Sequence, residues 1–267
     1  DGTLTATLPI TQLAALGTHQ RYRVELPAGS SRLTFTTEDA DDRGPWRFAL
    51  LSDVQTAIDE VDDVFVSVNE ADVRFLLGAG DLTEDGTPAE LVAFKEAMQR
   101  SLTVPYYTTL GCHDAPPDTP WHDHFGRANA RFRFRDVTFS LLDSASATVA
   151  PTVYGWLDTW LAEAATDVHV VAMHIPPLDP VGVRNGAFGS RLEAADLLTR
   201  LAGGGVDLTL YGHIHSFYGY DNAGIPAIIS GGGGAQPEQL DGVGRHIVVV
   251  ELGADQGLGP LRFVPVD

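Results

Sequence analysis

The stretch WRFALLSDVQ, residues 46–55, sets a pattern that the chain repeats: a short apolar run followed at once by polar side chains. The repeats are VRFLLGAGDL (73–82), VPYYTTLGCHD (104–114), HVVAMHIPP (169–177) and DLTLYGHIH (207–215). Short apolar runs of this kind are typical of buried strands. Stretches with helical spacing lie between them, at 88–100, 154–164 and 189–204. Strands that alternate with helices predict an α/β layered fold.

Later parts of the chain are also β-rich. Residues 130–134 and 137–144, separated by Arg135 and Asp136, predict a hairpin added to the main sheet. The late apolar runs predict a second sheet; they are 225–230, 245–252 and 261–266.

The N-terminal part reads differently from the rest. RYRVEL (21–26) and SRLTFTT (31–37) are β-rich and flank the turn signal PAGS, which predicts a short N-terminal hairpin. An acidic linker, EDADDRGP, follows. We therefore divide the chain into an N-terminal β segment with its linker, 1–44, and a main domain, 45–267, on which that segment docks.

Composition restricts the classes of function. The chain has 267 residues, 44% of them hydrophobic, which is enough for one large domain with a sizeable core. No apolar run approaches the roughly 18 residues that a membrane span needs. With 36 Asp plus Glu against 17 Lys plus Arg, the net charge of -19 opposes binding to nucleic-acid polymers or anionic membranes. The one lysine, Lys95, lies in a helix-like stretch and has no P-loop context.

The compartment stays open. One cysteine cannot form an internal disulfide, so cysteine usage does not identify an oxidising environment. The chain starts at Asp1 without a methionine, which is compatible with export after removal of a signal segment. Without such a segment the expected location is the cytoplasm.

The polar clusters are the candidate site. Ligands of open α/β sheets gather at the carboxyl ends of the strands, so clusters that are distant in sequence meet at one rim. Seven side chains are expected there: Asp53, Asp81, His113, Asp114, His174, His213 and His215. Carboxylates and imidazoles at this density suit a divalent metal ion, because buried charges without a cation would be costly.

Each of these residues taken alone also has an ordinary structural interpretation. Asp53 could cap a following helix, and the loop at Asp81 could be a plain turn. His174 could be a core histidine satisfied by hydrogen bonds. Five clusters that each follow an apolar strand are harder to explain in this way, and we favour the metal-site interpretation.

The series of clusters resembles the calcineurin-like metallophosphoesterase superfamily. That family's pattern is D-x-H, G-D, G-N-H-D/E, a histidine after a strand, and G-H-x-H, in this order. Here the resemblance covers residues 46 to about 235. The passage from residue 21 to residue 53 is similar to the entry into the catalytic domain of purple-acid-phosphatase-like members. The resemblance implies two β-sheets sandwiched between helices, with two metal ions at the strand ends.

The resemblance also implies a role for each residue. Asp53 and His215 would bind the first ion, Asp81 would bridge both, and His174 and His213 would bind the second. His113 would contact the substrate as the catalytic group, with Asp114 orienting it. A metal-bound hydroxide would attack phosphorus in a phosphomonoester or phosphodiester. The implied metals are zinc, iron or manganese, and the implied partner is a small phosphorylated substrate.

Two positions depart from the family pattern. Gln55 stands where D-x-H has its histidine, and Cys112 stands where G-N-H-D has its asparagine. A glutamine offers a weak oxygen ligand or none, whereas a cysteine offers a soft thiolate. We therefore expect the second site, with Asp81, Cys112, His174 and His213, to be the tighter and softer one. Cys112 could instead be a buried apolar thiol.

Two further residues are candidates for substrate contact. His124 lies in the loop PWHDHFGR, and Arg184 follows His174 on a loop that could reach a phosphate. The motifs do not separate an esterase from a nucleotide or pyrophosphate hydrolase. With two ligands altered, a catalytically weak relative that only binds metal and phosphate also stays open.

Overall fold

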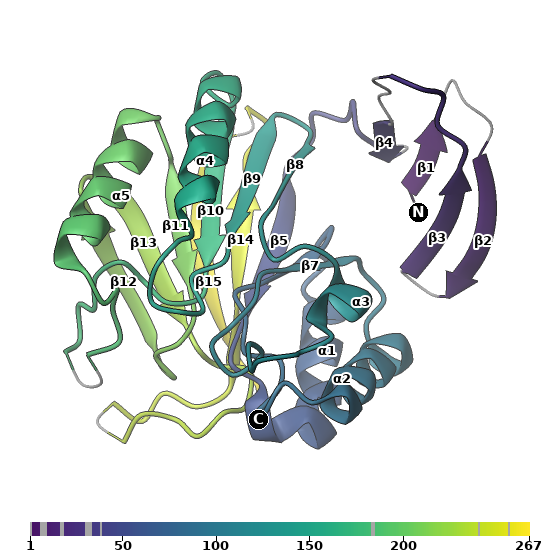
Figure 1. The fold of residues 1–267 in the computed structure, drawn as a ribbon. Coiled ribbons are helices and arrows are strands. Elements are labelled where there is room, and N and C mark those ends of the chain that lie inside the picture. The colour runs from purple at the N-terminus through teal and green to yellow at the C-terminus, as the bar shows by residue number, and fades with distance from the viewer. Residues whose placement is uncertain are drawn as a thin grey trace.

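The computed structural model describes residues 2–5, 10–16, 19–29, 34–37, 39–182, 185–239, 241–255 and 257–267. Its main body has four layers, helix, sheet, sheet and helix, as Figure 1 shows. This confirms the predicted α/β sandwich. Within the described ranges, no helix combines the length and apolar character needed to span a bilayer.

The first sheet has five strands in the order β15-β14-β5-β6-β7. The bounds are β5 Trp46–Leu51, β6 Leu76–Gly78, β7 Tyr106–Thr108, β14 His246–Leu252 and β15 Leu258–Pro265. β5, β6 and β7 run parallel, and β14 and β15 add antiparallel strands at one edge. Parallel neighbours bring their carboxyl ends to the same rim, so the loops after β5, β6 and β7 meet there.

The second sheet has six strands in the order β12-β13-β11-β10-β9-β8. The bounds are β8 Ala130–Phe134, β9 Val137–Leu142, β10 Val168–Met173, β11 Leu208–Tyr211, β12 Phe217–Asn222 and β13 Ile225–Ser230. β8 and β9 form the predicted hairpin. The expectation for the late runs was wrong: β13 joins this sheet, whereas β14 and β15 join the first sheet, so these three strands do not form a sheet of their own.

Helices cover the outer face of each sheet. The first sheet carries α1 Val61–Glu70 and α2 Pro88–Ser101, and a 3-10 helix, Gln55–Glu60, precedes α1. The second sheet carries α4 Pro151–Glu163 and α5 Arg191–Gly203. A further short helix, α3, spans Trp121–Phe125. The predicted helices at 88–100, 154–164 and 189–204 correspond to α2, α4 and α5, and the sequence reasoning missed α1.

The space between the sheets is filled by aromatic and aliphatic side chains. Phe48 of β5 stacks on Phe75 with ring centroids 5.6 Å apart, and Phe139 of β9 meets Phe48 edge-on at 5.2 Å. Phe48 and Phe139 belong to opposite sheets, and all three rings are fully or almost fully buried. Burial of such rings stabilises a fold by about 2–3 kcal/mol each, so the contact fixes how the two sheets, and their two rims, are placed against each other.

The N-terminal strands pair differently from the prediction. β3, His19–Val24, pairs with β2, Ile10–Leu16, and β4, Thr34–Thr37, pairs with β1, Gly2–Thr5. The two strands that we expected to form one hairpin therefore belong to different pairs, because each has an upstream partner that the turn signal did not reveal. Figure 1 shows these strands, in purple, beside the main body.

One buried arginine joins the linker to the main body. Arg135, in the β8–β9 turn, donates to the carbonyl of Gly44 at 3.0 Å and to the carboxylates of Asp39 and Asp42 at 3.0 and 3.2 Å. Its side chain is 3% exposed and lies over the ring of Phe134. The division into 1–44 and 45–267 stays a prediction, but the acidic linker has a defined anchor.

Candidate metal centre and active site

The polar loops meet at one rim, where the carboxyl ends of strands from both sheets come together. Asp53 follows β5, Asp81 follows β6 and Cys112 follows β7, all in the first sheet. His174 follows β10 and His213 follows β11, in the second. The rim therefore contains donors from both halves of the sandwich, which no single stretch of sequence supplies.

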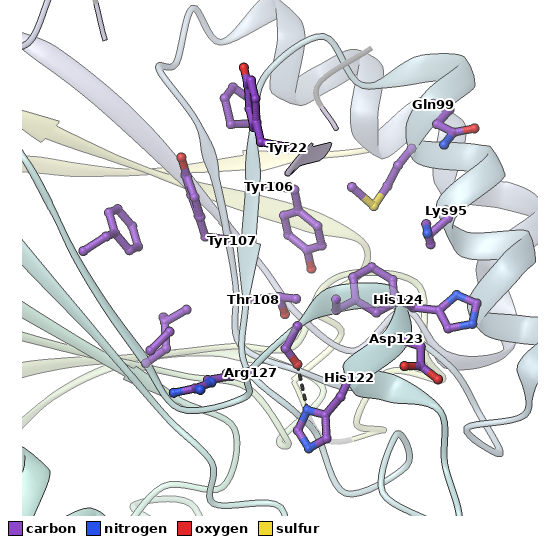
Figure 2. Close-up of a pocket in the computed structure, with 17 residues that line it drawn as sticks. Tyr22, Lys95, Gln99, Tyr106, Tyr107, Thr108, His122, Asp123, His124 and Arg127 are labelled. Carbon is purple, nitrogen blue, oxygen red and sulfur yellow. Dashed lines mark hydrogen bonds between the residues drawn. The ribbon is translucent and has the colours of Figure 1, made fainter. Parts of the chain in front are cut away.

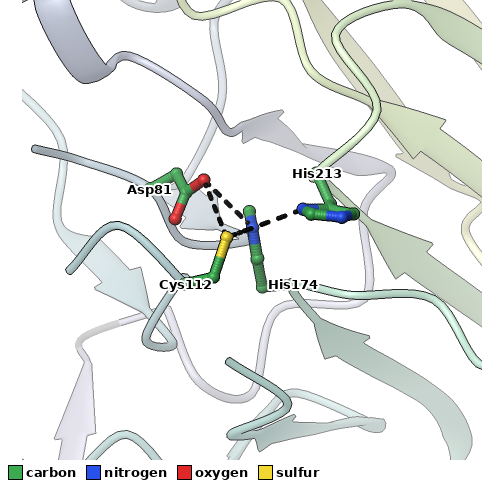
Figure 3. A group of neighbouring side chains, drawn as sticks. All are labelled: Asp81, Cys112, His174 and His213. Atoms are coloured by element: carbon green, nitrogen blue, oxygen red, sulfur yellow. Dashed lines mark hydrogen bonds and ion pairs between the residues drawn. The ribbon is translucent and has the colours of Figure 1, made fainter. Parts of the chain in front are cut away.

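Four side chains converge most closely: Asp81, Cys112, His174 and His213. Their ligand atoms all lie within 4.8 Å of one another. Figure 3 shows the sulfur of Cys112 between the carboxylate of Asp81 and the two imidazoles. The sulfur is 3.6 Å from Oδ2 of Asp81, 3.5 Å from Nε2 of His174 and 3.7 Å from Nδ1 of His213.

Four of these separations fit a tetrahedral metal ion. Zinc bonds of about 2.3 Å to sulfur and about 2.0–2.1 Å to nitrogen or oxygen place two such ligands about 3.5 Å apart at tetrahedral angles. The three sulfur distances lie at that value, and Nε2 of His174 is 3.1 Å from Oδ2 of Asp81. The donor set of one thiol, one carboxylate and two imidazoles is one that zinc or ferrous iron accepts. The residues therefore fit the cation that the sequence pattern predicts.

The protons on these ligands depend on one another. Burial raises the pKa of the Cys112 thiol, and the negative charges of Asp81 and Asp53 add to this against the opposing effect of His174. Burial also acts on Asp81 and His174, but their mutual attraction outweighs it, so the pKa of Asp81 lies below and that of His174 above the ordinary value. A metal ion binds thiolate and neutral imidazole, so its binding would release these protons.

Residues beyond the ligands fix their orientation. Nδ1 of His174 donates to the carbonyl of Ala79 at 2.8 Å, which turns Nε2 toward the cluster. Nδ1 of His215 likewise donates to the carbonyl of Gln236 at 2.8 Å. A hydrogen bond to the far nitrogen is the usual way in which a protein sets the tautomer of a ligating histidine.

The remaining predicted ligands form a second group beside the cluster. Asp53 is fully buried, and its Oδ1 lies 3.4 Å from Nε2 of His215. The side-chain nitrogen of Gln55 lies 3.0 Å from Oδ2 of Asp81 and 3.3 Å from Nε2 of His215. All seven predicted ligands are thus brought to one place, in two sets that share Asp81.

The backbone at this rim is held in an uncommon conformation. Asp53, Gln55, Asp81 and His213 have φ values of 63°, 49°, 55° and 69°. Non-glycine residues in this left-handed region cost about 1–3 kcal/mol each, and such residues concentrate at functional sites. The conformation turns each side chain off the end of its strand and into the rim.

Two glycines of the motifs are required by close approach. A Cβ on Gly111 would collide with the backbone nitrogen and the carboxylate of Asp81. A Cβ on Gly212 would collide with the Ser52 hydroxyl and lie 2.7 Å from Oδ2 of Asp53. Each glycine thus lets a neighbouring strand end approach an aspartate that belongs to the site.

His113 borders the cluster. Its backbone N–H donates to Oδ1 of Asp81 at 2.8 Å, and its Nδ1 donates to the carbonyl of Glu84 at 2.8 Å. The carboxylate of Glu84 lies 3.7 Å from the same nitrogen. The side chain is 39% exposed, so Nε2 is the ring nitrogen left for a substrate.

Asp114 is hydrogen-bonded to the backbone of the loops around His113. Its buried carboxylate accepts hydrogen bonds from the backbone of Leu82, Thr83 and Gly111 at 3.0 Å each, and from the Thr83 hydroxyl at 2.7 Å. Burial, together with the nearby charge of Asp81, raises its pKa to about 6. Its hydrogen bonds go to the loops that contain Asp81 and Cys112, whereas Glu84 contacts the imidazole of His113, so the orienting role expected of Asp114 stays a prediction.

Of the two candidates for substrate contact, the structure describes only His124. His124, with Lys95 and Arg127, lines a cavity of about 620 Å³ between α2, α3 and the edge strands β7 and β8, as Figure 2 shows. None of the predicted metal ligands lines this cavity. Arg184 lies outside the described residues. The roles that we assigned to individual residues stay predictions, although the geometry brings the main set together.

Sequence reasoning missed several supporting groups. Ser52 donates to Oδ2 of Asp53 at 2.6 Å, and Glu84 contacts His113. Ser52 is a polar residue directly beside the motif residue Asp53, and this adjacency was the signal that pointed to it; Glu84 lies three positions after Asp81 in the same polar loop. The carbonyls of Ala79 and Gln236 carry no such signal, because any residue type supplies a carbonyl.

Comparison with known proteins identifies the class. A family model, calcineurin-like phosphoesterase, matches residues 47–217. The chain therefore belongs to the calcineurin-like phosphoesterase family, as the motifs predicted. The match spans all five loops that form the rim.

Individual relatives agree with this assignment. The chain is 28% identical over 156 residues to a 3',5'-cyclic-nucleotide phosphodiesterase from Nostoc sp. (strain PCC 7120); the match covers 54% of the chain and 56% of the relative, so it spans about half of that protein. The fold is similar to a purple acid phosphatase from yellow lupin, with a TM-score of 0.62, 12% identity, 88% of this chain and 57% of that one. A dimetal phosphatase from Danio rerio also has a TM-score of 0.62, with 13% identity, 83% of this chain and 99% of that one.

Proposed function

We propose that this chain hydrolyses small phosphomonoesters or phosphodiesters at a metal centre formed by Asp81, Cys112, His174 and His213. The single observation that carries the proposal is the convergence of these four donors within 4.8 Å, beside His113. Family membership supports the reaction class, since the matched model is that of a phosphoesterase.

The four donors would hold a cation at the rim. Such a cation, when bound, supplies Lewis-acid chemistry: it activates water and offsets the negative charge that develops around phosphorus. The protein's own contribution is to fix the donors by buried hydrogen bonds, as at His174 and Ala79. The chain's net charge of -19 would otherwise repel an anionic substrate, so a local positive centre is needed to bind one.

His113 is the proposed catalytic residue. Because Nδ1 is held by the carbonyl of Glu84, Nε2 would face a phosphoryl oxygen or protonate the leaving group. The carboxylate of Glu84 also lies 3.7 Å from Nδ1, so both the backbone and the side chain of Glu84 border the ring. Asp114 holds the loop that positions His113 and Cys112 relative to Asp81.

The curated relative favours a diester as the first substrate to test, because it is described as a phosphodiesterase of cyclic nucleotides. A nucleotide or pyrophosphate substrate would use the same donors.

The test compares p-nitrophenyl phosphate, its bis ester and a 3',5'-cyclic nucleotide under added zinc, manganese or ferrous iron. We expect turnover that requires metal and that falls by about 100-fold or more in His113→Ala, the scale of a lost general acid. Leu192→Ala, at a residue that is 86% exposed on α5, serves as the control and should keep full activity. Metal binding without turnover of any of these esters would favour the catalytically weak relative.

A further inference from the structure

We propose that the side-chain amide of Gln55 takes the place of the first metal ion, so that the chain holds a single ion at Asp81, Cys112, His174 and His213. The inference rests on the proposed function, which places an ion at those four donors. It goes further because it replaces the expected weaker ion beside them by a hydrogen-bonded group of the protein itself.

Gln55 lies where the first ion would have to be coordinated. Its side-chain nitrogen is 3.0 Å from Oδ2 of Asp81, the predicted bridging carboxylate, and 3.3 Å from Nε2 of His215, a predicted ligand of the first ion. The residue is 6% exposed, and its backbone is held by the carbonyl of Asp81. The amide is therefore a fixed part of the rim, in contact with two of the three other donors of that site.

The hydrogen bonds of His215 determine what its other nitrogen presents. Nδ1 donates to the carbonyl of Gln236 at 2.8 Å, and a neutral imidazole carries one proton. In that neutral form Nε2 presents a lone pair toward the rim, 3.4 Å from Oδ1 of Asp53. Oδ2 of Asp81 is an acceptor as well. The space between Oδ2 of Asp81 and Nε2 of His215 is therefore favourable for a cation or for a group that donates two hydrogens.

The amide of Gln55 meets that requirement in one orientation only. Its NH₂ group has two hydrogens, one for Asp81 and one for His215. If the amide were turned, its oxygen would face a carboxylate oxygen and an imidazole lone pair, and this is favourable only with a cation between them. The side chain can thus act as a donor without an ion or as a ligand with one, and the two roles exclude each other.

Asp53, the remaining donor of that site, is also satisfied by the protein. Its two oxygens accept the backbone N–H of His213 at 3.1 and 3.0 Å, and the Ser52 hydroxyl donates to Oδ2 at 2.6 Å. A buried carboxylate with such donors needs no metal ion to compensate its burial. Asp53 is thus surrounded by hydrogen-bond donors of the protein, whereas in the four-donor cluster a thiol and two imidazoles lie around one point.

The two sites also differ in donor strength. A carboxamide oxygen is a weak, hard ligand, whereas the cluster offers a thiolate and two imidazoles. An ion entering the first site would displace the two hydrogen bonds that Gln55 donates, and the amide oxygen that would then face it is the weakest of its four donors. An ion at the cluster breaks none of these and gains four ligands, so only the cluster retains an ion.

The experiment is metal analysis of the whole chain after equilibration with excess zinc and gel filtration. We expect about one zinc ion per chain for the wild type. Gln55→Glu keeps the shape but replaces the NH₂ donor by an oxygen, and it should retain about two ions per chain, because a carboxylate there needs a cation between itself, Asp81 and His215. Gln55→His, which restores D-x-H, should also retain about two.

Gln99→Glu provides the matched control, since it adds the same charge at an exposed position on α2 and should retain about one ion. Two retained ions in the wild type, or one in both Gln55 variants, would overturn the inference while metal-dependent turnover still supports the phosphoesterase. If a Gln55 variant does not fold, the wild-type stoichiometry alone decides. No retained ion and no turnover would defeat the proposed function instead.

Discussion

The backbone N–H of His113 donates a hydrogen bond to Oδ1 of Asp81 at 2.8 Å, while Oδ2 of the same carboxylate faces Cys112 and His174. One aspartate therefore connects the predicted catalytic histidine to the metal cluster. We predict that Asp81→Asn, which keeps the shape but removes the charge, lowers zinc affinity by more than the roughly 10–100-fold that loss of an outer partner costs. Competition with a chromogenic chelator measures the zinc affinity of the variant and of the wild type. Asp85→Asn, an exposed residue of the same loop, should bind zinc as tightly as the wild type.

Cys112 gives the cluster its soft character. In the cobalt(II)-substituted protein we expect a sulfur-to-metal charge-transfer absorption in the near ultraviolet, because the thiol lies 3.5–3.7 Å from three other donors. Cys112→Asn should lose this absorption and should shift preference from zinc toward manganese, since an amide oxygen is the harder ligand. The far-ultraviolet circular dichroism should not change. Persistence of the band in Cys112→Asn would show that the sulfur is no ligand.

Gly111 is required by the approach of Asp81. We predict that Gly111→Ala destabilises the protein and weakens zinc binding, because the new Cβ would collide with the backbone and carboxylate of Asp81. Gly155→Ala is the matched control: it lies inside α4 with no atom within 4 Å of the added Cβ. It should raise the free energy of unfolding by about 0.5–1 kcal/mol, as in other exposed helices. Urea unfolding of both variants distinguishes local packing from a general intolerance of alanine.

His169 makes the fold sensitive to acid. It is fully buried on β10 beside Ser140, and burial, with the nearby charge of Arg131, lowers its pKa to about 4. The folded protein then binds fewer protons than the unfolded chain, whose histidine has a pKa near 6.5. The stabilisation is complete above about pH 6.5 and is lost as the pH falls toward 4, by about 3 kcal/mol in all. Between pH 7 and pH 4 the free energy of unfolding should fall by about 3 kcal/mol less in His169→Gln than in the wild type. The same pH dependence in both proteins would contradict the assignment.

The strand-then-cluster pattern was readable from the sequence for a physical reason. Buried strands such as β5 and β10 are continuous apolar runs, and each run ends where polar residues begin. The fold class, the candidate ligand residues and the hairpin β8–β9 follow from this. Elements whose environment is set by distant segments did not follow from it. α1 has few local signals, β14 joins the first sheet by pairing with β5, and β15 in turn pairs with β14. The N-terminal strands pair with upstream partners.

For the candidate metal centre, the sequence by itself determined the donor types, including the cysteine and glutamine departures, because motif position fixes which strand end a residue follows. Only the tertiary structure decided how those donors are grouped. Four of them surround one point, whereas Gln55 places its amide between Asp81 and His215. That distinction depends on distances of about 3 Å between residues up to 160 positions apart, and spacing along the chain carries no information at that scale.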